Sequence, residues 1–191
     1  MLKGARCETA KCAMERQWRN KPPGMHSWRR KRSSGDFGVR LREKQKVKRY
    51  YGVFERQFMN YFRKAERTKG NTGEALLVIL ERRLDNVVWK LGFAPSRKAA
   101  RLAIVHGHVY VNGRRLNRSS YSVNVGDRIS AKPSERSRNF VRQAFGDDGP
   151  SVQEWLQVDG PSLEGKVVAL PAREHVQIPV EEQLIIEMCS R

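Results

Sequence analysis

The hydrophobic residues of this chain change their spacing near residue 107, and this change limits the folds that are open to it. Up to that point they recur at helical intervals, as Leu76, Leu80, Leu84 and Val88 do. Beyond it, "HVYV", a turn-forming "NG" and "RRL" have the pattern of two short strands joined by a tight turn. A helix-rich N-terminal half followed by a mixed region predicts an α+β fold.

The same patterns locate the individual elements. Helices are expected over residues 39–52, 54–70, 72–92 (as one helix or as two that meet near 81–83), 96–106 and 135–145, with a last short helix starting at Pro179. Strands are expected over 108–111, 114–116, 121–130, 154–159 and 166–171. Thr72 and Ser96 are the expected N-caps, because a side-chain oxygen there can accept from a free amide of the first turn.

Two apolar stripes indicate which helix faces are buried. The first belongs to the helix at 54–70 and consists of Phe54, Phe58, Tyr61, Phe62 and Ala65. The second belongs to the last helix and consists of Leu184, Ile185 and Met188. Residues at this spacing share one side of a helix, so both stripes are predicted to face a core.

The net charge of +18 indicates a polyanionic partner, because it would otherwise repel itself in a compact chain. Residues 1–70 hold 21 basic and 6 acidic side chains, and residues 71–143 hold 14 and 5. Residues 144–191 reverse the balance with 3 basic and 9 acidic side chains. The anion-binding surface is therefore expected in the first three quarters of the chain.

The first 36 residues are expected to form a basic, largely extended arm. They contain few large apolar groups and the breakers Pro22, Pro23 and Gly24, so alone they cannot bury enough surface to offset the entropy of ordering. Within "WRRKR" the arm has four consecutive cations that are candidates for RNA contact: Arg29, Arg30, Lys31 and Arg32. Trp18 and Trp28 can stack on bases, which favours nucleic acid over a merely solvated charge run.

Several classes of protein are disfavoured by the sequence. No apolar run approaches the roughly 18 residues of a membrane span, and the N-terminus lacks the apolar core of a signal peptide. Three cysteines without an export signal argue against a disulfide framework and fit a reducing compartment. We therefore expect a cytoplasmic protein; binding to an anionic membrane surface is the weaker alternative, since no strongly amphipathic basic helix is present.

The segment from residue 82 to residue 115 concentrates basic side chains on a predicted pair of helices and a hairpin. The helix at 96–106 has Arg97, Lys98 and Arg101 in its N-terminal half, where the free amides and the helix dipole also favour a phosphate. The other cations are Arg82, Arg83, Lys90, Arg114 and Arg115. Because the short helix ends at Gly107, the surface suits a folded RNA better than a DNA major groove.

His106 and His108 flank Gly107 and raise the question of a metal or catalytic site. No convincing third and fourth ligand lies nearby in the sequence, so no metal site is predicted. Ser96 is better explained as a cap, and no nucleophile, base and orienting acid can be assembled from these positions. We expect both histidines to line the edge of an RNA-binding surface.

Residues 83–130, "RLDNVVWKLGFAPSRKAARLAIVHGHVYVNGRRLNRSSYSVNVGDRIS", resemble the S-four RNA-binding domain. The resemblance to the family of bacterial small-subunit ribosomal protein four extends over nearly the whole chain. It includes "RCETAKCAMERQ", "PPGMH", "VRLREKQKVKRYYGVFERQF", "SERSRN" and "IPVEEQLIIEMCSR". The resemblance implies a helical N-terminal domain and an S-four-type domain of packed helices with a small, twisted antiparallel sheet.

The resemblance also implies a function without catalysis. Such proteins bind the five-prime domain of 16S rRNA early in assembly of the small ribosomal subunit and contact small-subunit ribosomal protein five. They are linked to translational accuracy, and some repress their own mRNA. We therefore expect a structural, rRNA-binding protein with no cofactor, no small-molecule substrate and no membrane partner.

Domain limits and RNA-contacting residues follow from the resemblance together with the charge pattern. The expected domains are the arm at 1–36, a helical domain at 37–81 with 179–191, and the RNA-binding domain with a β-rich extension at 82–178. Besides the four cations of the arm, the expected RNA contacts are Arg40, Arg42, Lys44, Lys46, Lys48, Arg49, Arg83, Ser96, Arg97, Lys98, Arg101, His106, His108, Asn112, Arg114 and Arg115.

One departure from the family concerns zinc. Some bacterial members hold zinc with four N-terminal cysteines, and here Cys7 and Cys12 match the later pair alone. Two thiolates do not complete a tetrahedral site, so no zinc is expected unless further ligands lie upstream or His26 and a partner ligand contribute.

The sequence leaves two alternatives to a ribosomal protein open. The S-four domain also occurs attached to pseudouridine synthases and tyrosyl-tRNA synthetases, so an RNA-modifying enzyme is one of them. Such enzymes need a catalytic domain, and this chain has no Gly-rich phosphate loop and no obvious pair of carboxylates in an apolar setting. A standalone RNA-binding factor with the same domain is the other.

Overall fold

The structure, a computed structural model, describes residues 35–146 and 152–190 and scattered positions before them, namely 4, 7, 9–12, 14–16, 21 and 24–27. The cations of the predicted arm, Arg29 to Arg32, lie outside the described residues. The same holds for Trp18 and Trp28.

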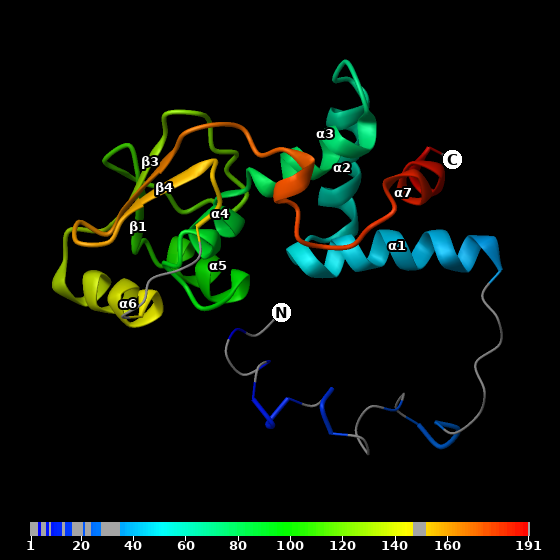
Figure 1. Cartoon of the computed structure of the whole chain (residues 1–191), viewed down its shortest axis with the longest axis horizontal. Helices are drawn as coiled ribbons and strands as arrows, with labels where there is room; N and C mark the ends of the chain where they lie inside the picture. Colours follow the sequence, from blue (N-terminus) through cyan, green and yellow to red (C-terminus); the bar gives the residue numbers. More distant parts are fainter. Residues whose placement is uncertain are drawn as a thin grey trace.

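Helices and one antiparallel sheet make up the described part of the chain (Figure 1). The helices are α1 (Asp36–Tyr51), α2 (Glu55–Glu66), α3 (Thr72–Glu81), α4 (Leu84–Lys90), α5 (Arg97–Val105), α6 (Glu135–Phe145) and α7 (Glu182–Cys189), with a 3-10 turn, η2 (Arg173–His175). The strands are β1 (Val109–Val111), β2 (Arg114–Arg115), β3 (Arg128–Ala131), β4 (Leu156–Asp159) and β5 (Glu164–Val167). The strand order is β2-β1-β3-β5-β4 with antiparallel neighbours throughout, which confirms the predicted α+β class.

We call α1, α2, α3 and α7 the helical part. Its core contains the predicted residues Phe58, Phe62 and Ala65 of α2 together with Ile185 of α7, all of them buried. Helix α7 packs along α1 and α3, so the C-terminal end of the chain returns to its helical beginning (Figure 1). The prediction that Phe54 belongs to this core is wrong, because its side chain is 82% exposed.

We call α4, α5, α6 and the sheet the sheet part. Helices α4 and α5 pack on each other, and Leu84, Ile104 and the α4 C-cap residue Leu91 share one apolar core with strand residues such as Ile129 and Val167. Glycine is required at position 165 of β5, since a Cβ there would lie 2.6 Å from Cδ1 of buried Leu91. The two apolar cores divide near residue 81, while the predicted domain limits stay a prediction.

Local signals located several helix ends, although α1 begins at Asp36, before the predicted 39, and α2 ends at Glu66, before the predicted 70. Gly52 ends α1 in the left-handed conformation at φ 63°, and the Ser96 side chain accepts from the amide of Ala99 at 3.2 Å, as an N-cap does. The long segment at 72–92 is two helices, α3 and α4, because the chain leaves helical geometry at Arg83. Its predicted cap, Thr72, is instead the first helical residue, and Asn71 accepts from the amide of Gly73 at 2.9 Å.

The predicted boundaries in the C-terminal half required three corrections. Strand β5 begins at Glu164, earlier than the predicted 166–171, because its register with β4 pairs Asp159 with Glu164. The segment 121–127 forms turns and one isolated bridge, so the strand predicted there is confined to β3. Helix α7 begins at Glu182 instead of at Pro179.

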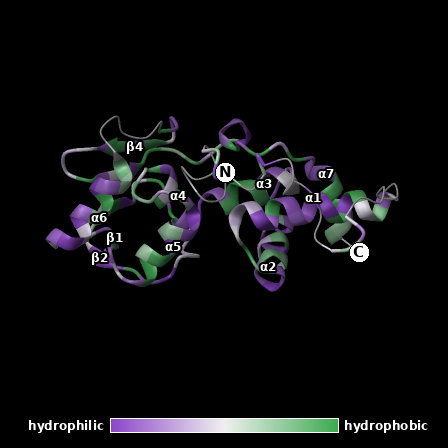
Figure 2. Ribbon diagram, turned by 90° about the horizontal axis from the view of Figure 1, so that it is seen from below, coloured by the Kyte–Doolittle hydropathy of each residue, from purple (hydrophilic) through white to green (hydrophobic). Residues whose placement is uncertain are grey.

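Polar and apolar residues are both present along the helices that cover the two cores. Hydrophilic residues recur along α1, α2 and α6 and alternate there with hydrophobic ones (Figure 2). Among the described residues, no helix combines the length and the hydropathy that crossing a bilayer requires.

Candidate nucleic-acid interface

The helical part and the sheet part meet at a junction of buried charges, which we call the seam. At its centre Asp85, the second residue of α4, is 1% exposed and accepts from two arginines. Arg83 donates through Nε to Oδ1 at 3.1 Å and through Nη2 to Oδ2 at 2.7 Å. Arg101 of α5 donates to Oδ2 through Nη2 at 2.6 Å and Nε at 3.1 Å. A buried carboxylate is thus neutralised by two guanidinium groups.

The same two arginines bind the helical part. Arg101 donates through Nη1 to the carbonyl oxygen of Gly52 at 2.9 Å and through Nη2 to that of Tyr51 at 3.2 Å. Arg83 donates through Nη1 to the hydroxyl of Tyr61 in α2 at 2.6 Å. Burial alone would lower the pKa of Arg83, but its bonds to Asp85 raise it, so this guanidinium stays charged. Each arginine therefore connects α4 or α5 to the helical part.

A second buried carboxylate, Glu81 at the end of α3, reinforces the seam. It is fully buried and accepts from the hydroxyl of Tyr51 at 2.5 Å, from Nδ2 of Asn86 at 2.7 Å and from Nζ of Lys90 at 2.7 Å. Burial and the Glu81 charge raise the pKa of Tyr51, so its hydroxyl remains a donor. Burial lowers the pKa of Lys90, and the Glu81 charge opposes that shift.

Arg97, the first residue of α5, is 7% exposed and is enclosed at the seam. Its guanidinium lies 3.9 Å from the ring centroids of both Tyr50 and Trp89, and its Nε donates to Oδ1 of Asn86 at 2.7 Å. Its buried Nη2 has no hydrogen-bond partner in the part of the chain that the structure describes. A desolvated arginine between two aromatic faces gains about 2 kcal/mol or more from each such contact.

A hollow of about 210 Å³ opens between the C-terminal end of α1 and the N-terminal end of α5, and we call it the seam hollow. It is lined by Arg49, Tyr50, Tyr51, Gly52, Phe54, Arg97, Lys98 and Arg101. The side chains of Arg49 and Lys98 are exposed, and neither forms an ion pair with any described residue. The first turn of α5 adds free amides and the positive end of the helix dipole. This combination attracts a phosphate.

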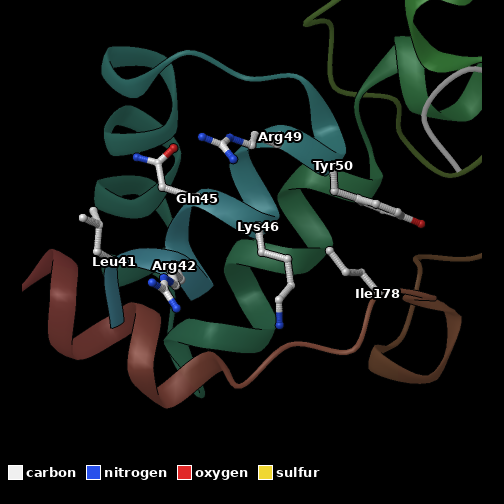
Figure 3. Close-up of a pocket in the computed structure, with 7 residues that line it drawn as sticks. All are labelled: Leu41, Arg42, Gln45, Lys46, Arg49, Tyr50 and Ile178. Atoms are coloured by element: carbon white, nitrogen blue, oxygen red, sulfur yellow. The ribbon is translucent and has the colours of Figure 1, made fainter. Parts of the chain in front are cut away.

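A larger hollow of about 630 Å³ lies along α1, and we call it the α1 hollow. Leu41, Tyr50 and Ile178 supply its apolar lining, while Arg42, Lys46 and Arg49 supply cations from successive turns of α1 (Figure 3). Lys46 is paired with Glu43 at 2.5 Å, and Arg42 forms no ion pair with a described residue. Arg49 and Tyr50 line both hollows, so the two hollows adjoin at the C-terminal end of α1.

The hairpin between β1 and β2 presents Arg114 and Arg115 to solvent. Asn112 adopts φ 51° in the turn, and its side chain donates to Asp127 at 2.8 Å and accepts from the amide of Arg128 at 2.9 Å. Asn112 thus holds the hairpin in place through internal bonds. Arg115 covers Gly107, where a Cβ would lie 2.5 Å from the arginine Nε.

The two histidines differ in their surroundings. His106 is exposed, whereas Nδ1 of His108 is 2.9 Å from the hydroxyl of Ser137 and its ring stacks on Phe140 at 5.6 Å. Burial and the nearby charges of His106, Arg136 and Lys132 lower the pKa of His108, so its neutral form is favoured. No cluster of three or more potential metal ligands occurs among the residues that the structure describes.

The structure gives several of the predicted RNA contacts internal partners. Arg83 and Arg97 are buried at the seam. Each guanidinium nitrogen of Arg101 donates a hydrogen bond to a protein oxygen. Lys44 and Lys48 pair with Glu55, and Arg40 pairs with Glu187. Ser96 and Asn112 use their side chains as a helix cap and a turn bond.

Direct contact with RNA is therefore best supported for the predicted cations that are exposed and unpaired among the described residues. These are Arg42, Arg49, Lys98, Arg114 and Arg115. The α1 and seam hollows bring the first three together, and the hairpin supplies the other two. The contact of each with RNA stays a prediction.

Phe54 is a candidate that the sequence prediction assigned to the wrong environment. It lies at the N-cap of α2 in extended conformation, so it does not continue the apolar stripe of that helix. Its ring is exposed at the seam hollow between cations, where it can stack on an unpaired base. The signal in the sequence was its position two residues after Gly52, which ends α1.

Replacing Phe54 with alanine is expected to weaken RNA binding by about 1–3 kcal/mol, the usual contribution of a stacked base, without lowering the melting temperature. The measurement is a titration of RNA at fixed salt together with thermal unfolding. Phe37→Ala is the matched control, because Phe37 is also exposed but lies at the opposite end of α1. Equal affinities of the two variants would exclude stacking on Phe54.

Fold and site together favour a nucleic-acid-binding protein, because a helical part and a sheet part present cations and an aromatic ring at one seam. Residues 1–81 match the family described as Ribosomal protein S4/S9 N-terminal domain, and residues 82–129 match the S4 domain.

The whole chain is also similar to curated proteins. It is 51% identical over 191 residues to the small ribosomal subunit protein uS4 of Halothermothrix orenii and 50% identical to that of Thermus thermophilus, covering 100% of this chain and 90% of each relative. The protein of the same name from Syntrophomonas wolfei is 49% identical with the same coverage. The chain belongs to the family of small ribosomal subunit protein uS4.

Family membership distinguishes a ribosomal protein from the RNA-modifying enzyme that the sequence left open as an alternative. It confirms the predicted resemblance and the S4 RNA-binding domain. The relatives are named as ribosomal proteins, so the prediction of a non-enzymatic protein is confirmed and an RNA-modifying enzyme is not supported.

Proposed function

We propose that this protein is a structural, rRNA-binding constituent of the small ribosomal subunit, located in the cytoplasm, and that it binds and organises the five-prime domain of 16S rRNA during assembly. Membership of the uS4 family supports the ribosomal role. The observation that carries the RNA-binding role is the group of exposed, unpaired cations around the two hollows.

The mechanism of binding is electrostatic and geometric. Exposed lysines and arginines displace counterions from RNA phosphates, and this release drives association and makes it dependent on salt. Because such contacts carry no base identity, selectivity comes from holding several cations at fixed separations that one RNA fold matches. The buried seam supplies that rigidity, and Phe54 adds a surface for stacking on a base.

Further proposed partners are small-subunit ribosomal protein five and the protein's own mRNA, and a contribution to translational accuracy is proposed with them. The resemblance to the family supports these three proposals. The basic arm, including Arg29 to Arg32, is proposed to add RNA contacts, since four adjacent cations favour crowded phosphates.

The test is a titration of the full chain against the five-prime domain of 16S rRNA and against bulk tRNA over a series of salt concentrations. We expect affinity for the five-prime domain to be higher by about a hundredfold or more at each salt concentration, as specific binding exceeds non-specific binding. Equal affinities for the two RNAs would contradict the proposed ribosomal target.

A further inference from the structure

Arg101 was predicted to contact RNA, but its hydrogen bonds point to another role. All three nitrogens of its guanidinium donate within the protein, to Asp85 and to the carbonyl oxygens of Tyr51 and Gly52. Figure 1 shows α5, which contains Arg101, beside the end of α1 that supplies those carbonyls. The side chain therefore bridges the sheet part and the helical part.

We propose that Asp85 and Arg101 are positioning residues for RNA binding: they fix the end of α1 against the start of α5, so that Arg49 and Lys98 face one RNA at a constant separation. This inference rests on the proposed function, because it assumes that the seam hollow binds RNA. It assigns to Arg101 a role inside the protein in place of a contact with phosphate.

The chemistry of the bridge suits this role. The last carbonyls of a helix lack partners within the helix and lie at the negative end of its dipole, where a cation is favourable. Gly52 ends α1, so Arg101 supplies the missing donors at that point. Asp85 is 1% exposed and holds the other edge of the same guanidinium, which prevents the side chain from swinging toward solvent.

The bridge matters for binding because Arg49 and Lys98 belong to different parts of the fold. Arg49 lies in the last turn of α1, and Lys98 lies in the first turn of α5. If the two parts can move, a fraction of molecules presents these cations at the wrong separation, and the apparent affinity falls by that fraction. The complex that does form keeps every phosphate contact.

The seam should survive loss of this one bridge. Tyr51 still donates to Glu81, and Arg97 still stacks between Tyr50 and Trp89. The side chain of Arg101 is 32% exposed, so its replacement does not leave a buried void of full size. Loosened orientation is therefore the expected effect of Arg101→Gln, and unfolding is not.

The experiment compares Arg101→Gln, Arg101→Lys and Lys98→Gln in the full chain. For Arg101→Gln we expect about a fivefold slower association with the five-prime domain of 16S rRNA, an unchanged dissociation rate and an unchanged dependence of log K on log salt. Arg101→Lys should behave in the same way, because one ammonium cannot reach the carboxylate and both carbonyls together. Lys98→Gln should instead reduce the salt slope by about 0.7 to 0.9.

Small-angle scattering of the free protein supplies a readout that needs no RNA. Arg101→Gln and Asp85→Asn should both increase the radius of gyration, whereas Asp159→Asn, an exposed charge-matched control on β4, should leave it unchanged. The double variant Asp85→Asn/Arg101→Gln should bind RNA no more weakly than Asp85→Asn, because that single variant already loses the pairs of Asp85 with both Arg101 and Arg83.

Three results would overturn the proposal. The first is a reduced salt slope of RNA binding for Arg101→Gln. The second is wild-type affinity of Arg101→Lys for RNA together with weak affinity of Arg101→Gln. The third is an unchanged radius of gyration for the Arg101 variants. The first two would restore Arg101 as a phosphate contact. If the wild-type chain shows no preference for the five-prime domain, the proposed target fails, and the scattering arm still decides whether the bridge orients the two parts.

Discussion

Replacing Arg49 and Lys98 with glutamate in one chain is expected to weaken binding to the five-prime domain of 16S rRNA by about 3 kcal/mol, or roughly 150-fold, at moderate salt. Both side chains are exposed at the seam hollow, and neither is paired with a described acid. Each reversal removes an attraction to phosphate and adds a repulsion beside the first turn of α5. The salt slope should fall by about 1.5, because two phosphate contacts are lost.

The control for the Arg49 and Lys98 double variant has the same change in net charge at positions outside the two hollows. Arg142 of α6 and Lys166 of β5 are exposed and line neither of the two hollows, so Arg142→Glu/Lys166→Glu separates local contact from general repulsion. The measurement is a filter-binding or fluorescence titration at several salt concentrations. An equal loss of affinity in both double variants would mean that the hollow has no special role and that net charge alone governs binding.

The second large effect is expected on stability. Glu81→Gln should lower the free energy of unfolding by about 3 kcal/mol, which is a large fraction of the 5–15 kcal/mol typical of a domain. Glu81 is fully buried and is the ion-pair partner of Lys90. Without the carboxylate, the ammonium remains buried and uncompensated, and Tyr51 loses its charged acceptor. Urea unfolding measures the change, and an unchanged m-value would show that it reflects stability.

The free energy of unfolding is also expected to depend on pH through Lys90. Burial lowers the pKa of Lys90 in the folded protein, so the unfolded chain, with a lysine pKa of about 10.4, binds more protons in the interval between the two pKa values. Stability therefore rises with pH across that interval. Glu81→Gln should make this rise larger, because it removes the carboxylate charge that opposes the lowering of the Lys90 pKa. The comparison is made below pH about 10, where ionisation of tyrosine in the unfolded chain begins to act in the opposite direction.

Two variants check that the loss comes from the orphaned charge. Glu74→Gln changes an exposed glutamate in the first turn of the same helix and should alter stability by less than about 0.5 kcal/mol. Adding Lys90→Met to Glu81→Gln removes the unpaired ammonium and should recover part of the loss. If Glu81→Gln unfolds at the same urea concentration as Glu74→Gln, the carboxylate does not hold the seam together.

Features that depend on neighbouring residues could be predicted from the sequence. The Ser96 cap and the "NG" hairpin each depend on bonds between residues a few positions apart, and both are found in the structure. The α+β class followed from the period of the apolar residues, which reflects local geometry. The sign of the partner's charge followed from composition, since it needs no coordinates.

The assignment of individual cations could not be made in this way. Arg97 and Lys98 are adjacent and equally basic, yet one is enclosed by aromatic rings and the other is exposed. Successive residues of a helix point about 100° apart, so what each one meets depends on elements that are distant in the sequence. Phe54 was misassigned for a related reason, because the helix that would have placed it on the core stripe begins one residue later.

The helices, the turns and the need for a polyanionic partner follow from the amino-acid sequence alone, because short-range backbone bonds and total charge specify them. The tertiary structure decided which basic side chains are available to RNA. It did so by bringing together Asp85, Arg101 and the end of α1 across long separations in the chain, where burial makes each unpaired charge costly and forces partners on it. Among the described residues, the exposed cations without an ion-pair partner are those that remain available to bind RNA.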